Sequence, residues 1–586
     1  MSTKSAGPDD AGAKRPGTVD PFTMVVLRRR MEAIIREMVN ALLKSGRSGV
    51  LNTAMDFSCS LTDARFQSVS VALGLPVHVG AIDLIPRKVA EKHGSTLAPG
   101  DCFANNSGYH GNTHCADFTL CVPVFYEGRV VFYTIARAHL GDMGFPIPST
   151  YNPAARDVYE EGLMLPCIRV QRDGRDIEDV IDILKANIRA PEQFYGDYLA
   201  CLAAVRTGEK RLKELCARFG TDLVERFIDE YQDYAELMAK DAISRLPKGR
   251  VTRSVRYDSE LAQYPDGIPV TATLDVDPDA GRVVIDLTEN IDNLPLGINM
   301  TESTVLACCR MGTLNVLGPD VPRSAGAFRR IEVRMRDGSA IGRPVFPAAT
   351  SAATTNLCHL LASHIQALYA DLVDGLGSAY GSVGLPGSCP VVSGRDPRRG
   401  NRPFVNQIIM GYWGGPAVAG HDGWLTYGSA ASQGILWQSS VEIVEQQQPI
   451  LIEELSIRED SGGAGASQGG PGSRVVFRPR FGPVRFAINA AAHDNPPEGM
   501  RGGLPGAPTR ISRIAADGTR TDLGITIDVT LGPGERLLSE ACGGGGYGTP
   551  AERPADRIAA DIADGVLTPA HAAKVYPRQA REGSGR

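Results

Sequence analysis

The chain has 586 residues, which is too many for one hydrophobic core, so we expect two or three domains. Hydrophobic residues make up 43% and charged residues 22%, as in an ordinary globular protein. The net charge of −6 excludes bulk attraction to nucleic acid or to an anionic membrane. No apolar run approaches roughly eighteen residues, so no membrane span is predicted. The twelve cysteines form no Cys-x-x-Cys pair, which indicates reduced thiols in a cytoplasmic protein.

Residues 1–18 are polar and lack the apolar core of a signal peptide, so we predict a disordered leader. Asp20 can cap a helix that has Pro21 in its first turn, and apolar residues then recur at helical spacing to about Leu43.

Two short strands are predicted next, over Met55–Cys59 and Leu75–Gly80. Asp56 interrupts an apolar context, and a carboxylate there needs a partner, a metal ion or solvent. His78 could be a metal ligand, but we interpret it as a hydrogen-bonded core histidine.

The segment Gly100–Gly144 concentrates two His-x-x-Asp patterns around one predicted β-hairpin. Its arms are Asp117–Phe125 and Val130–Ala138, and Tyr126–Arg129 supplies a turn with a glycine. If Tyr126 lies opposite Val130, then Asp117 lies opposite His139. The same register places His114 opposite Asp142, whereas a shift of one residue, which a bulge can cause, would separate the side chains onto opposite faces.

Two imidazoles and a carboxylate on neighbouring strand ends are usual donors for Zn, Mn or Fe in a site with open positions. The alternative is a set of ordinary polar residues at strand ends. One His-x-x-Asp would not outweigh that alternative, but two of them framed by a hairpin favour a site for a divalent metal ion.

The rest of the chain supplies a frame for this segment. A proline-rich loop at 146–151 is expected to wall the site, and a helical pattern runs from 192 to 245. Strand patterns dominate from residue 250, with a hairpin around 277–281, one strong helix over 354–372 and a last helix over 558–575. The glycine clusters near 461–465 and 543–548 lack the setting of a dinucleotide site or a P-loop, so we interpret them as loops that allow close backbone packing.

We therefore predict a multidomain α+β fold, in which mixed β-rich sheets pack with helices and the metal site lies on an N-terminal hairpin. The predicted divisions are a leader (1–18), a metal-binding α+β region (19–249), a β-rich and glycine-rich region (250–550) and a C-terminal helix with a tail (551–586).

Several motifs together resemble the hydantoinase B/oxoprolinase family, over nearly everything from residue 19 to 576. The motifs are Asp56–Cys59, Pro76–Gly80, Gly111–Asp117, Ala138–Gly144, Asp460–Gly465 and Gly543–Pro550. Within the family, YHGNTH at Tyr109–His114 departs from the commoner YLGGTH of N-methylhydantoinase-type subunits. It resembles the α subunit of acetone carboxylase, as do Pro148–Gly162 and Pro191–Lys210, although this chain is shorter than that subunit.

The resemblance implies that His114, Asp117 and His139 carry the metal, with His110, Asp142 and Asp56 as candidates for proton transfer or for orienting the ligands. It also implies a hetero-oligomer with a larger hydantoinase A-type subunit that binds ATP, and leaves a small third subunit open. The expected activity is metal-assisted carboxylation of a phosphorylated ketone enol. The alternatives are ATP-dependent hydrolysis of a cyclic amide, and a scaffold subunit whose metal is structural. Three protein ligands argue against the scaffold, because structural sites are usually closed.

Overall fold

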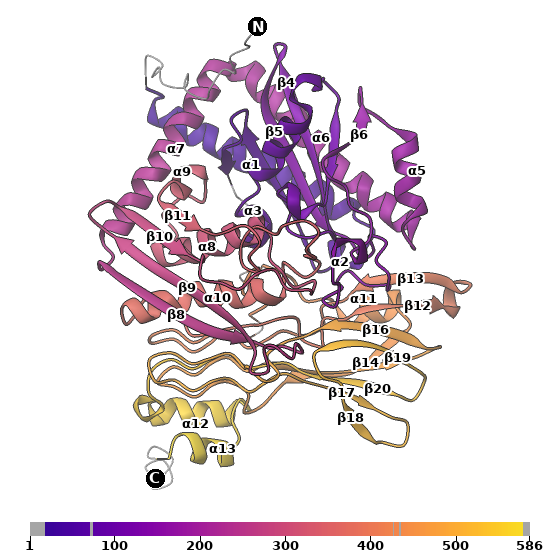
Figure 1. The fold of residues 1–586 in the computed structure, drawn as a ribbon, viewed down its shortest axis with the longest axis vertical. Coiled ribbons are helices and arrows are strands. Elements are labelled where there is room, and N and C mark those ends of the chain that lie inside the picture. Colours follow the sequence, from indigo (N-terminus) through magenta and orange to yellow (C-terminus); the bar gives the residue numbers. More distant parts are fainter. Residues whose placement is uncertain (1–17, 71–73, 426, 433–434, 578–586) are drawn as a thin grey trace.

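The computed structural model describes residues 18–70, 74–425, 427–432 and 435–577, so all of the predicted leader except its last residue lies outside the described residues. The chain builds four sheets and a set of packed helices, which confirms the multidomain α+β prediction (Figure 1). None of the described helices is long and apolar enough to cross a membrane. Because no finding bears on the predicted domain boundaries, they stay predictions.

The N-terminal sheet has seven strands and holds the predicted hairpin as its two central neighbours. In sheet order the strands are β2 (Ser68–Ser70), β1 (Phe57–Asp63), β5 (Arg129–His139), β4 (Asp117–Tyr126), β3 (Cys102–Asn105), β6 (Ile168–Arg172) and β7 (Arg175–Asp176). Alternation along β4 and β5 gives the sheet two different faces. Phe118, Leu120 and Val122 pack in one hydrophobic cluster, whereas Cys121 and Ile135 belong to another.

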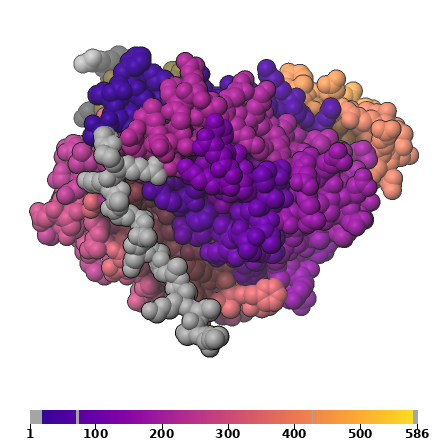
Figure 2. Space-filling view, turned by 90° about the horizontal axis from the view of Figure 1, so that it is seen from above, coloured from indigo at the N-terminus to yellow at the C-terminus, as the bar shows by residue number. Residues whose placement is uncertain are grey.

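Helices α1 (Pro21–Ser45) and α6 (Pro191–Phe219) cover the first of these faces. Asp20 accepts a hydrogen bond from the Thr23 amide and Pro21 opens α1, as the sequence predicted. The long helical stretch is two helices, because Gly220 adopts φ 79° between α6 and α7 (Thr221–Ser244). Helix α4 (Leu84–His93) covers part of the opposite face. Seen from the N-terminal end, the surface is formed mainly by the first half of the chain, with the C-terminal part at one edge (Figure 2).

A second sheet begins at the predicted boundary near residue 249. Its strands, in order, are β11 (Ile331–Arg334), β10 (Arg282–Asp286), β9 (Ile268–Asp277) and β8 (Gly249–Tyr257). The predicted hairpin is β9–β10, and the predicted helix is α10 (Asn356–Leu372), which packs on α8 (Glu302–Leu317) and on this sheet. This second body supplies the far wall of the cavity described below.

The C-terminal region holds the other two sheets. One contains β13 (Arg402–Gln407), β12 (Val391–Asp396), β16 (Val484–Asn489) and β19 (Thr526–Leu531). The other contains β14 (Ile450–Ile457), β15 (Ser473–Pro479), β20 (Arg536–Glu540), β17 (Arg510–Ile514) and β18 (Arg520–Asp522). The short helices of the chain are α2 (Gly49–Asn52), α3 (Pro76–Val79), α5 (Glu178–Ala186), α9 (Ala325–Phe328) and α11 (Val441–Gln447).

Two predictions of local structure are wrong. Leu75–Gly80 is the short helix α3 instead of a strand, because Pro76 starts a helical turn that packs on α8. The last helix is split into α12 (Ala555–Ala563) and α13 (Pro569–Val575), with Gly565 left-handed at φ 72° between them.

The late glycine clusters pack backbone against backbone, as predicted. A Cβ atom on Gly543 would lie 1.7 Å from the carbonyl oxygen of Ser461, and one on Gly544 would lie 1.8 Å from that of Gly415. The amide of Gly463 donates to the carbonyl of Gly544 at 2.8 Å. Only glycine allows these extended segments to approach so closely.

Candidate metal centre

Strands β4 and β5 place Asp117 directly opposite His139, so the register predicted at this end of the hairpin is confirmed. The pairing at the turn differs from the prediction, because Tyr126 lies opposite Arg129. Glu127 and Gly128 form a two-residue turn with φ 49° and 79°. A bulge between Val124 and Phe125 then shifts the register by one residue and restores the predicted pairing at Asp117.

His114 is held by the loop that enters β4. Gly111 has φ 81°, and a Cβ atom there would lie 2.6 Å from the Cβ of Leu84, so the loop packs tightly against α4. The side chain of Asn112 donates to the carbonyls of His114 at 2.8 Å and Asp117 at 2.7 Å. These bonds fix the backbone on both sides of the His-x-x-Asp turn, so His114 faces the strand ends.

Three donor atoms meet at this point. His114 Nε2 lies 3.1 Å from Asp117 Oδ1 and 3.2 Å from His139 Nδ1, and His139 Nδ1 lies 3.2 Å from Asp117 Oδ1. All three side chains are buried. Donors that each lie about 2.0–2.2 Å from one ion are about 3.0–3.5 Å apart, so this triangle has the size a metal site requires.

Hydrogen bonding around the triangle also suits a cation. The ring of His114 faces the Ser351 carbonyl through Nδ1 at 2.7 Å, and because a carbonyl only accepts, this nitrogen carries the hydrogen. In the neutral imidazole the lone pair of Nε2 then faces the carboxylate oxygen of Asp117, which is an unfavourable contact between two acceptors. A proton or a metal ion between them removes that conflict, so the donor set fits a divalent ion.

The protonation states follow from burial and charge. Burial lowers the pKa of His139 to about 4, so its ring is neutral near pH 7. Burial alone would raise the pKa of Asp117, but the neighbouring His114 and His78 outweigh it and hold that pKa well below its usual range. A neutral imidazole and an ionised carboxylate are the forms that bind metal.

Two residues outside the hairpin complete the surroundings of the centre. Tyr151 stacks on His114 with ring centroids 5.5 Å apart and on His139 at 5.4 Å. Nε2 of His78 lies 3.2 Å from Asp117 Oδ2 and 3.7 Å from Asp56 Oδ1. His78 was interpreted as a core histidine, and it is buried, but it also contacts the carboxylate of Asp117. Its place in the family-like motif Pro76–Gly80 was the signal that could have revealed this.

A cavity of about 40 Å³ opens on the centre. The hairpin side and the loop 146–151 contribute Asp117, His139 and Tyr151, so this loop does wall the site. Asp56 lines the cavity, and burial together with the charge of Asp117 raises its pKa well above the usual value. The remaining lining residues are Leu75, Val77, His78, Thr354, Thr355, His359, Leu385, Gln407, Ile409, Ser429, Ser432 and Leu436.

Two predicted site residues lie in other environments. Asp142 does not face His114, because its carboxylate accepts hydrogen bonds from the Arg189 side chain at 2.9 Å, from the Arg189 amide at 2.7 Å and from the Gly144 amide at 3.0 Å. Strand β5 ends at His139, so the alternation that would have aligned residue 142 stops before it. His110 hydrogen-bonds through Nδ1 to Ser107 at 2.9 Å and does not line the cavity.

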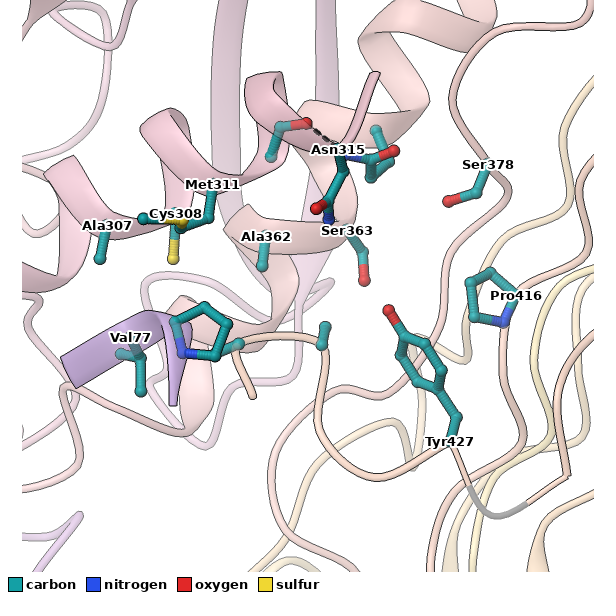
Figure 3. Close-up of a pocket in the computed structure, with 15 residues that line it drawn as sticks. Val77, Ala307, Cys308, Met311, Asn315, Ala362, Ser363, Ser378, Pro416 and Tyr427 are labelled. Carbon is teal, nitrogen blue, oxygen red and sulfur yellow. Dashed lines mark hydrogen bonds between the residues drawn. The ribbon is translucent and has the colours of Figure 1, made fainter. Parts of the chain in front are cut away.

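A second cavity is also lined by Val77 (Figure 3). The hydroxyl of Tyr427 points into it toward Ser363, and helices α8 and α10 form one wall. Its volume is about 20 Å³, which is room for about one water molecule. Neither a carboxylate nor an imidazole lines it, so this cavity offers no acid–base group of the kind found at the hairpin.

The fold and the site together define a multidomain α+β protein with a buried cluster of two histidines and one aspartate. The hydantoinase B/oxoprolinase family model matches residues 20–550, and the chain belongs to this family. The family resemblance that the sequence motifs indicated is therefore confirmed.

Two similar proteins are named as parts of larger assemblies. The beta subunit of caprolactamase from Pseudomonas jessenii is 29% identical over 561 residues, which cover 94% of each chain. The B-type subunit of a putative D-/L-hydantoinase from Pseudomonas sp. (strain NS671) is 28% identical and covers 94% of this chain. The 5-oxoprolinase PfmaA of Pestalotiopsis fici is 26% identical over 91% of this chain but only 42% of its own length.

Solved structures give the same picture. The ATP-dependent caprolactamase from Pseudomonas jessenii superposes with a TM-score of 0.87, at 28% identity, over 96% of both chains. Acetone carboxylase in its nucleotide-free form has a TM-score of 0.84 and 18% identity, covers 95% of this chain and 79% of its own, and shares the fold. The proteins similar to this chain thus include an ATP-dependent caprolactamase, a subunit of a putative hydantoinase and a 5-oxoprolinase, and an acetone carboxylase has the same fold.

Proposed function

We propose that the chain is the metal-binding catalytic subunit of an ATP-dependent enzyme that acts at the carbonyl group of a small molecule, and that it hydrolyses a cyclic amide. The observation that carries the choice of reaction is the match with caprolactamase, which extends over 96% of both chains with a TM-score of 0.87. The match with acetone carboxylase leaves about a fifth of that longer chain uncovered.

His114, Asp117 and His139 would hold one divalent ion, of Mn, Zn or Fe, because neutral imidazoles and a carboxylate suit these metals. Such an ion acts as a Lewis acid on a carbonyl oxygen and lowers the pKa of water. The buried Asp117 supplies one negative charge at the centre, and Ser351 fixes the ring orientation of His114.

The chain's own residues shape the place for a substrate. Leu75, Val77 and Ile409 give the cavity apolar walls that would contact the methylene groups of a small ring. Thr354 and Gln407 offer polar groups beside them, and the Oε1 atom of Gln407 is buried without a hydrogen-bond partner among the described residues. Apolar walls also exclude bulk water, which strengthens polar interactions at the carbonyl.

A larger hydantoinase A-type subunit would bind ATP and phosphorylate the carbonyl oxygen. The sequence has neither a P-loop pattern nor a dinucleotide pattern, and two relatives are named as one subunit of an assembly. We therefore propose a hetero-oligomer that works in the cytoplasm. Its reduced, buried cysteines agree with that compartment.

A ketone carboxylase is the second candidate, and sequence observations favour it. Tyr109–His114 and Pro148–Gly162 resemble the α subunit of acetone carboxylase more than an N-methylhydantoinase subunit. In that reaction the partner would phosphorylate an enolised ketone, and the same cavity would hold the enol next to a carbon derived from CO₂.

Purified chain and partner subunit, assayed together for ATP hydrolysis, distinguish the two reactions. Cyclic amides of different ring size are tested in one series, and small ketones with and without bicarbonate in the other. ATP turnover stimulated by a lactam without bicarbonate supports hydrolysis. Turnover that requires both a ketone and bicarbonate contradicts it and supports the carboxylase.

A further inference from the structure

His359 is a histidine of the metal cavity that comes from outside the metal-binding hairpin. It lies near the start of α10 and lines the same cavity as Asp117 and His139. In Figure 1, α10 lies below the hairpin strands, in the part of the molecule that supplies the far wall. Among the described residues, its side chain has a hydrogen bond with Gly384 and a ring contact with Trp413, and neither partner belongs to the triangle.

One hydrogen bond occupies one ring nitrogen of His359 and leaves the other without a partner among the described residues. Nδ1 lies 2.9 Å from the carbonyl oxygen of Gly384, which only accepts, so Nδ1 carries the hydrogen. Gly384 adopts φ 64°, and a Cβ atom there would lie 2.7 Å from the amide nitrogen of Ala491, so this carbonyl is held in place by close packing. In the neutral ring the other nitrogen, Nε2, then keeps a free lone pair.

Packing against neighbouring side chains also fixes the orientation of the His359 ring. His359 is 2% exposed and packs edge-on against the buried Trp413, with ring centroids 5.6 Å apart and an interplanar angle of 86°. Burial lowers its pKa to about 4, so the ring is neutral at physiological pH. The titratable groups that share its cavity are Asp56, His78, Asp117, His139 and Tyr151.

A neighbouring histidine on the same helix shows the contrast. His364 is buried as well, but its Nδ1 bonds the Tyr380 hydroxyl at 2.6 Å and its Nε2 lies 3.1 Å from the Arg253 carbonyl. Both of its nitrogens are occupied by the protein, so His364 is structural. Within α10, the only histidine that leaves a nitrogen free toward the cavity is His359, among the residues the structure describes.

We infer that His359 is the proton-transfer residue of the cavity, acting through Nε2 on the substrate held at the metal centre. This inference rests on the proposed function. As the oxygen of a water molecule bonds to the amide carbon, the lone pair of Nε2 takes one proton from that water. The same proton passes to the ring nitrogen of the substrate as the C–N bond breaks, which returns neutral His359. The phosphoryl group stays on the acyl oxygen during this step, and a second water molecule then hydrolyses the acyl phosphate to the carboxylate and free phosphate.

The same geometry serves the second candidate reaction. There Nε2 takes a proton from the carbon next to the ketone carbonyl, and the electron pair of that C–H bond forms the enol double bond as the phosphoryl group is placed on oxygen. Both reactions need a neutral base whose nitrogen has no hydrogen-bond partner before the substrate binds. The role of His359 can therefore be tested on whichever reaction the wild-type complex catalyses.

His359→Asn is the decisive variant, because the amide nitrogen of asparagine can keep the donation to Gly384 while the base is removed. His364→Asn is the matched control on the same helix. In the assembled complex we expect His359→Asn to lower kcat about 100–10,000-fold with little change in metal content or thermal midpoint, and added imidazole to restore part of the rate. His364→Asn should lose thermal stability and keep kcat per folded molecule.

An unchanged kcat in His359→Asn, with wild-type turnover established, overturns this role and leaves the proposed function standing. A second measurement needs no turnover. In ¹⁵N-labelled protein, the histidine signals lost in His359→Asn should report a neutral ring with hydrogen on Nδ1. If those signals report hydrogen on Nε2, the assignment is wrong whatever the enzyme's reaction.

Discussion

The two carboxylate oxygens of Asp117 face different histidines: Oδ1 lies 3.1 Å from His114 Nε2, and Oδ2 lies 3.2 Å from His78 Nε2. The second oxygen also accepts the hydroxyl of Thr113. The carboxylate of Asp117 therefore contributes Oδ1 to the triangle, while Thr113 and His78 hold its Oδ2 in place. Since outer partners of this kind orient a metal ligand, His78 is expected to tune metal affinity without binding the ion.

His78→Ala should weaken metal affinity about 10–100-fold, because Asp117 loses the partner of its outer oxygen. The measurement is metal competition against a chelator on the purified chain. His93→Ala is the control, because His93 bonds the Cys167 carbonyl at 2.7 Å and does not line the cavity. Equal affinities in His78→Ala and the wild type would show that His78 does not orient the carboxylate.

Asp142→Asn should leave metal affinity unchanged and reduce the free energy of unfolding by about 1–3 kcal/mol. The reason is that Asp142 is buried against Arg189 and two backbone amides, away from the triangle. Denaturant unfolding and chelator competition on the same variant separate the two effects. A loss of metal at full stability would contradict this assignment and restore the contact with His114 that the sequence predicted.

The part of the centre that sequence could predict is the part that local periodicity controls. The alternation of side chains along two apolar arms predicted that Asp117 lies opposite His139. The turn itself is one residue out of the predicted register, and the bulge between Val124 and Phe125 corrects this difference before Asp117. The prediction for Asp142 was wrong because β5 ends at His139, so the alternation of side chains along the strand does not extend to residue 142. Helix α10 and the hairpin β9–β10 were predictable for the same reason, since each has a strong and continuous pattern.

The residues that sequence missed are brought in by packing between distant segments. Val77 and Val79 flank His78 with the alternation of a strand, yet a Cβ atom on Gly80 would lie 2.6 Å from the Cα of Ala307, so close docking on α8 selects a helix. Tyr151 and His359 reach the centre from a loop and from α10. The residue spacing within one segment cannot predict contacts between distant segments, because those contacts depend on how whole helices, strands and loops pack together.

His359 and His364 should each make the metal-free chain lose stability as the pH falls below about 6.5. Burial lowers the pKa of His359 to about 4 and that of His364 to about 3, so the unfolded chain binds these protons at a higher pH than the folded chain does. The contribution of these two histidines to stability therefore rises with pH over this window, whereas Glu161, whose pKa burial raises to about 8, contributes in the opposite direction. Between pH 6.5 and pH 5 each histidine is expected to cost about 2 kcal/mol. Urea unfolding at three pH values measures how the free energy of unfolding depends on pH, and His364→Asn should make this dependence weaker.

The chain expressed without a partner should neither bind nor hydrolyse ATP, because its sequence offers no phosphate-binding pattern. Calorimetric titration with Mg²⁺-ATP is the measurement, with Mg²⁺ alone as the blank. Tight binding by the isolated chain would contradict the assignment of ATP to a second subunit.

His139→Ala should abolish turnover and metal content together. His139 supplies one of three donors in a buried triangle, and two donors cannot keep an ion in a site that excludes most water. The side chain packs on Tyr151 inside the chain, so removing it should leave assembly with the partner subunit largely intact. Metal analysis of the purified complex, alongside size-exclusion chromatography, measures both properties.

His110→Ala is the matched control for that experiment, because it also removes an imidazole from the same loop region. Its ring bonds Ser107 and does not line the cavity, so metal content should stay at the wild-type level. Full metal occupancy in His139→Ala would show that the triangle is only a hydrogen-bonded cluster. Metal lost from His110→Ala to the same degree would instead mean that the loop, and no particular donor, controls occupancy. Loss confined to His139→Ala is the result that the 3.1–3.2 Å triangle predicts.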